Sequence, residues 1–96
     1  MDKPIKVIID WSFESEGGLA VLPPIGERYP MRISASNIPH EGILWNVLIT
    51  NTSIDERMSE ADISFLEEGP PREVLRNGQI FDLFKGFDLV AVGMVK

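Results

Sequence analysis

The stretch GQIFDLFKGFDLVAVGMVK, residues 78–96, has an alternating apolar pattern on each side of Lys85-Gly86. Side chains on a β-strand point to opposite faces with a period of two, so this pattern predicts a hairpin with its tip at Lys85-Gly86. Before the tip, Phe81 and Leu83 share one face. After it, the pattern predicts one face made of Val90, Val92 and Met94, and an opposite face made of Leu89, Ala91 and Gly93.

Four upstream segments show strand-like patterns as well. Residues 5–13 alternate most clearly, residues 28–35 and 61–65 alternate over shorter spans, and ILWNVLIT at 43–50 is apolar enough for a central strand. Between them lie loops rich in glycine and proline, such as LAVLPPIGE at 19–27. Many short strands with hardly any helical period predict an all-β domain, either a barrel or a sandwich.

Two segments have less regular patterns. In NTSIDERMSEAD, residues 51–62, two Ser-x-x-acid patterns resemble helix starts, so a helical turn within residues 53–60 is an open alternative. In PREVLRNG, residues 71–78, the proline at the start and the glycine at the end would suit a single helical turn.

Length and charge restrict the class of protein. The 96 residues predict one domain over residues 1–96, and the net charge of −6 makes nucleic acid an unfavourable partner. No cysteine is present, which excludes disulfides and thiolate chemistry. IKVII at residues 5–9 is too short for a signal-peptide core or a membrane span, so we expect a cytoplasmic protein without a membrane partner.

Two stretches resemble the C-terminal barrel domain of elongation factor Tu. ESEGGLAVLPPIGERYPMR at 14–32 is similar to a run near the start of that domain, and FDLFKGFDLVAVGMV at 81–95 resembles its closing hairpin. The matching positions are Glu16-Gly17-Gly18, Gly26, Arg28-Tyr29-Pro30, Phe81, Leu83, Gly86, Val90, Gly93 and Val95. The resemblance covers most of the chain, and it implies a six-stranded antiparallel closed barrel.

The chain departs from that family at positions that matter for RNA. The family carries a basic residue and a histidine after the double glycine, where this chain has Leu19 and Ala20, and its closing hairpin has an Arg-Glu-Gly-Gly-Arg tip in place of residues 84–88. The chain also has no phosphate-binding loop, so we expect no GTP and no other cofactor. Because a fold does not carry its function with it, the resemblance alone gives only weak support for a role in translation.

Few residues are candidates for catalysis or metal binding. His40 is the single histidine and stands beside Glu41, but no nucleophile motif frames a serine or threonine, so an exposed loop histidine is the favoured interpretation. The carboxylate groups at 14–16 and 55–60 lack calcium-loop spacing and are interpreted as solvated turn charges, so we expect no metal. Trp11 and Trp45 lie in strand patterns and are expected in the core.

The candidate interaction residues lie at the hairpin tip and in one loop. Phe84 is out of phase with Phe81, so at least one of Phe84 and Phe87 is expected to face solvent or a partner. Together with Leu19, Val21 and Leu22 they would form an apolar patch, although the loop could equally act as a lid on the barrel end.

The leading hypothesis is therefore a non-enzymatic module that binds a protein partner. Its acidic loops would suit a basic target, and an inhibitor or an immunity protein is one form that such a module could take. One alternative is an RNA-associated relic of the translation factor, with Arg28, Arg32, Arg72 and Arg76 on one face. The other is a small enzyme that uses His40.

Overall fold

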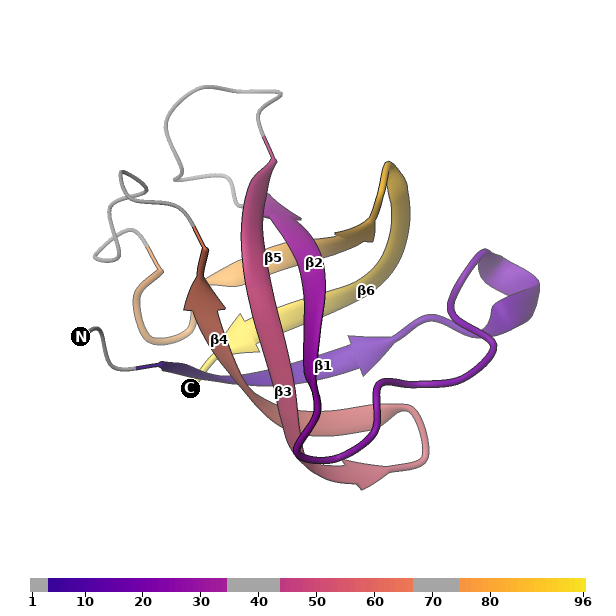
Figure 1. Cartoon of the computed structure of the whole chain (residues 1–96), viewed down its shortest axis with the longest axis horizontal. Coiled ribbons are helices and arrows are strands. Elements are labelled where there is room, and N and C mark those ends of the chain that lie inside the picture. Colours follow the sequence, from indigo (N-terminus) through magenta and orange to yellow (C-terminus); the bar gives the residue numbers. More distant parts are fainter. Residues whose placement is uncertain (1–3, 35–43, 67–74) are drawn as a thin grey trace.

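The six strands form a closed antiparallel barrel. The computed structural model describes residues 4–34, 44–66 and 75–96, and within these ranges the strand order is β1-β4-β3-β2-β5-β6, with β6 pairing back to β1 (Figure 1). The strands are β1 (Ile5–Trp11), β2 (Arg28–Ser34), β3 (Trp45–Asp55), β4 (Met58–Phe65), β5 (Ile80–Lys85) and β6 (Asp88–Val95), and a 3-10 turn η1 (Glu14–Glu16) follows β1. The expected barrel is confirmed, and closure leaves no sheet edge along these strands. In the same ranges no helix is long and apolar enough to cross a membrane.

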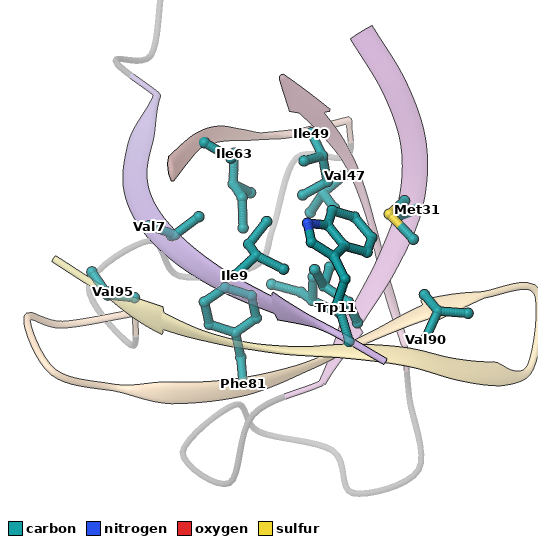
Figure 2. Close-up of a cluster of buried hydrophobic side chains, with 14 of the residues drawn as sticks. Val7, Ile9, Trp11, Met31, Val47, Ile49, Ile63, Phe81, Val90 and Val95 are labelled. Carbon is teal, nitrogen blue, oxygen red and sulfur yellow. The ribbon is translucent and has the colours of Figure 1, made fainter. Parts of the chain in front are cut away.

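Alternate side chains of all six strands fill the barrel interior (Figure 2). The inward positions agree with the sequence pattern in β1, where Val7, Ile9 and Trp11 are buried, and in β5, where Phe81 and Leu83 are buried. Complete burial of each large aliphatic or aromatic side chain contributes about 1.5–3 kcal/mol, so this interior is the main source of stability in a chain without disulfides. β1 ends at Trp11, two residues earlier than its pattern suggests, and Phe13 is exposed.

The β5–β6 hairpin contains a β-bulge that changes the predicted faces of β6. Leu83 pairs with Ala91 but Phe84 pairs with Leu89, so Val90 is an extra residue on β6. A bulge shifts the side-chain alternation by one position, and Val90 is buried together with Ala91. The prediction that Val90 shares a face with Val92 and Met94 is therefore wrong, because those two side chains lie on the outer surface.

Residues 51–62 form a hairpin and not a helical turn. β3 continues to Asp55, which pairs with Met58 of β4, and Glu56 at the tip has a positive φ of 57°. The helix-start patterns are overridden because Asn51, Ser59 and Ala61 point into the barrel and complete the alternation of the two strands.

The segment before β5 is described only in part. Residues 75–79 form a bend and a turn, in which the Gln79 amide donates to the Arg76 carbonyl at 2.8 Å. Leu75 of this segment is buried against the core. The rest of the helical turn predicted for residues 71–78 lies outside the described residues.

Candidate functional site

The hairpin tip is a two-residue turn that presents one aromatic ring to solvent. Lys85 pairs with Asp88, and Gly86 takes a positive φ of 65°, which suits the turn between them. Phe87 at the tip is 84% exposed, whereas Phe84 is half-buried beside Arg32 of β2 and Leu89 of β6. The expectation that at least one of the two phenylalanines faces solvent is met by Phe87.

The loop between β1 and β2 has both a buried and an exposed side. Leu19 and Leu22 are half-buried and pack against the core cluster, as a lid on the barrel would, while Val21 between them is 79% exposed. The loop and the hairpin meet at a groove of about 360 Å³, which we call the tip groove. Loop residues 19–24, Tyr29 of β2 and Lys85 of β5 line it.

Two basic side chains lie beside the aromatic rings of Tyr29 and Phe87. The Lys85 ammonium lies 5.8 Å from the centre of the Tyr29 ring, and the Arg32 guanidinium lies 5.2 Å from the centre of the Phe87 ring. Both distances are within the range of cation–π attraction. Although the net charge of the chain is −6, Lys85 is the one charged side chain among the described residues that line the tip groove. The acidic surface expected for a basic target is not found in this groove.

A chain of buried hydrogen bonds holds the loop in place. Trp11 Nε1 donates to Ser59 Oγ at 2.9 Å, Ser59 Oγ donates to Asn51 Oδ1 at 2.8 Å, and Asn51 Nδ2 donates to the Pro23 carbonyl at 2.9 Å. The Gly26 amide also donates to the Asn51 carbonyl at 2.9 Å. The interior of the barrel therefore fixes the backbone of the loop that forms one wall of the tip groove.

Arg57, in the β3–β4 turn, clamps the other end of this loop. Its Nη2 donates to the carbonyls of Ser12 and of Leu19, the latter at 3.4 Å, and its guanidinium lies 5.3 Å from the centre of the Phe13 ring. Gly18 permits this close packing, because a Cβ atom there would collide with the Ser12 carbonyl. These contacts hold the end of β1, the start of the β1–β2 loop and the β3–β4 turn together.

Sequence reasoning missed the residues that support the site, namely Asn51, Ser59 and Arg57. The first two could have been found, since Asn51 continues the inward series Val47 and Ile49, and Ser59 begins the series that continues with Ala61. A polar residue at an inward position needs a hydrogen-bond partner, which is itself a signal. Arg57 gave no such signal, because its partners are backbone carbonyls from residues distant in the sequence.

The other candidate residues are placed as follows. Trp11 is in the core as expected, while Trp45 is half-buried, packs against the core, and has a buried Nε1 without a hydrogen-bond partner among the described residues. Arg28 and Arg32 alternate with the inward residues of β2 and so share its outer face, whereas Arg76 lies before β5. His40, Glu41 and Arg72 lie outside the described residues. Within residues 4–34, 44–66 and 75–96, no group of three histidine or acidic residues is arranged to hold a metal.

Comparison of the chain with protein-family models, with curated proteins and with solved structures found no match. The six-stranded closed barrel is established by the strand pairing alone. The resemblance to the C-terminal barrel of elongation factor Tu stays a prediction.

Proposed function

We propose that the chain is a non-enzymatic protein-binding module and that the tip groove is its binding site. The observation that supports this most directly is the groove itself. It is lined mostly by apolar side chains, among them the exposed Val21, and ends at Lys85, two residues from the exposed Phe87. Solvent-exposed apolar groups gathered around a concave site are typical of surfaces that bind other proteins.

The lining suggests the chemistry of the partner. An apolar side chain of the partner would fill the groove against Leu19, Leu22 and Pro23, and an acidic group beside it would approach Lys85. The buried hydrogen-bond chain and the Arg57 clamp hold the loop backbone, so little conformational entropy would be lost on binding. A cytoplasmic inhibitor or immunity protein would be one form of such a module.

A second candidate function is RNA binding by a relative of the translation factor's barrel domain. The observation in its favour is that Arg28 and Arg32 share the outer face of β2, and that Arg32 pairs with Phe84 of β5, the residue next to Lys85. A phosphate backbone would be drawn to these charges, with an affinity that falls steeply as salt rises.

Partner capture with surface variants tests the proposal. The tagged protein would be incubated with lysate of its native cell, with and without nuclease, alongside a V21D/F87D variant and an I25D/L66D control. All four residues are exposed, so the variants should fold alike. Val21 lines the groove and Phe87 is two residues from the lining residue Lys85, whereas Ile25 and Leu66 are not lining residues. We expect one stoichiometric protein that survives nuclease, is lost with the groove variant and is kept with the control.

Other outcomes would reject the proposal. Nuclease-sensitive material alone, with a steep salt dependence, would favour the RNA candidate. Equal loss in both variants, or recovery of no protein, would exclude the tip groove as a protein-binding site.

A further inference from the structure

β6 is apolar on both of its faces, although only one face points into the barrel. Ala91, Gly93 and Val95 are buried, while Val92 and Met94 are each 39% exposed on the outside. Antiparallel sheets with one solvated face normally alternate apolar-in and polar-out. On the other side of the barrel, the outer faces of β2 and β3 are mainly polar, with Arg28, Arg32, Asn46 and Thr50, and the pair Pro30 and Leu48 is apolar.

Strand register extends the exposed apolar surface of β6 onto both neighbours. Met94 pairs with Ile80 of β5 on one side and with Ile8 of β1 on the other. Ile80 is 52% exposed and Ile8 is half-buried, so three apolar side chains lie in a row across three strands. Exposed apolar side chains from adjoining positions enlarge this row. We call the whole set the outer strip: Ile8, Met58, Ile80, Leu89, Val92 and Met94.

Carboxylates flank the outer strip at fixed positions. Val92 pairs with Asp82 of β5 and with Asp10 of β1, so an aspartate stands on each side of it. Neither aspartate forms an ion pair in the described part of the chain, in contrast to Asp62, which lies 3.5 Å from Lys6. Two acidic groups are thus available to a ligand beside the apolar surface.

A hollow continues the strip at the β3–β4 hairpin. Its volume is about 130 Å³, and Ile8 and Met58 line it together with Asp55 and Glu60. Glu60 is already bound by Lys96 at 2.8 Å, but Asp55 has no such partner among the described residues. An apolar hollow with a free carboxylate suits the long side chain of lysine or arginine, whose methylenes pack on apolar surface while the charged end reaches an acid.

These observations select one kind of occupant. A second copy of this chain docking the same face by two-fold symmetry would bring Asp10 and Asp82 against the same acids, and anionic lipid or nucleic acid would be repelled. We propose that the outer strip binds a basic amphipathic segment of a partner protein, with apolar side chains over Val92 and Met94 and lysine or arginine beside Asp10 and Asp82. This surface shares no residue with the tip groove and does not depend on it.

A defined peptide tests this surface. The isotopically labelled protein would be titrated, by NMR, with a synthetic amphipathic peptide of leucine and lysine, and with a second peptide in which glutamate replaces lysine. We expect shift changes confined to β5, β6, β1 and the β3–β4 hairpin with the lysine peptide only. D10N/D82N should weaken binding by about three- to tenfold, since each exposed ion pair adds little by itself, and V92T/M94T should weaken it as well.

Matched controls make the test decisive. E14Q/E27Q removes the same charge from exposed positions elsewhere and should leave the affinity unchanged. V21T, an uncharged change in the lining of the tip groove, should also leave it unchanged, which separates this surface from the tip groove. Equal weakening by the two charge variants, shift changes spread over the whole surface, or equal binding of the glutamate peptide would overturn the proposal. So would self-association in sedimentation that V92T/M94T abolishes, since it would assign the strip to a second copy.

Discussion

At the scale of single residues, the barrel interior is not purely apolar. Ser59 accepts from Trp11 and donates to Asn51, so one small hydroxyl satisfies two larger buried groups. Both Ser59 and Asn51 are almost fully buried. A buried polar group without a partner costs about 1–3 kcal/mol. Ser59 therefore stabilises the fold mainly because it keeps Trp11 Nε1 and Asn51 Oδ1 hydrogen-bonded.

Ser59→Ala is therefore expected to lower the free energy of unfolding by about 2 kcal/mol or more, because Trp11 Nε1 and Asn51 Oδ1 both lose their partner. Urea denaturation followed by tryptophan fluorescence measures this. Ser64→Ala, at an exposed position of the same strand, is the control and should change stability by less than about 0.5 kcal/mol. Equal effects of the two substitutions would show that the hydrogen-bond chain contributes nothing.

At the scale of elements, β6 depends on a residue without a side chain. Gly93 stands opposite Phe81 of β5, and a Cβ atom at position 93 would run into the Phe81 ring. Gly93 thus makes room for the Phe81 ring inside a narrow barrel. The β-bulge places Val90 in the interior beside Ala91, so two consecutive residues of β6 contribute to the core.

Gly93→Ala is expected to destabilise the protein by about 1–3 kcal/mol, which is typical of overpacking in a filled core. The double variant with Phe81→Leu tests the cause. If the collision with the ring is responsible, the alanine should cost clearly less in the Phe81→Leu background, and a double-mutant cycle from chemical denaturation measures that coupling. Strictly additive effects would assign the loss to strand propensity instead.

At the scale of the whole molecule, a backbone hydrogen bond and an ion pair tie the end of the chain to β1 and β4, where the barrel closes. The Lys96 amide donates to the Lys6 carbonyl at 3.0 Å, and the Lys96 ammonium lies 2.8 Å from Glu60 Oε1 on β4. The hydrogen bond and the positive charge of Lys96 lower the pKa of Glu60 below its ordinary value. Because the folded state holds Glu60 more strongly in its charged form, this pair stabilises the fold above the unfolded-state pKa and loses its effect as pH falls through the folded-state pKa.

Carboxyl NMR titration should therefore give Glu60 a pKa below that of a free glutamate, and Lys96→Met should raise it toward the ordinary value. Added salt should raise it as well, because both partners are exposed and salt screens their attraction. Lys85→Met removes a lysine at the hairpin tip and should leave the Glu60 pKa unchanged. A Glu60 pKa that is insensitive to Lys96→Met would contradict this assignment of its cause.

For the candidate site, the sequence indicated its parts but not their arrangement. Phe87 could be expected on the outside, because a turn between two alternating strands has no interior. The groove between residues 19–24 and Lys85 could not be expected, since it depends on β2 pairing with β5 across a long stretch of sequence. The basic character of that groove was missed for the same reason, because net charge says nothing about which charges meet.

What the sequence determined by itself is the all-β class, the hairpin near Lys85-Gly86 and the inward faces of β1 and β5. All of these follow from alternation between neighbours, which the chain sets locally. Only the tertiary structure decided the bulge at Val90, the hairpin at Glu56, the Trp11–Ser59–Asn51 chain and the outer strip. Each of these depends on which strands lie side by side, and burial in a closed barrel can override local preference.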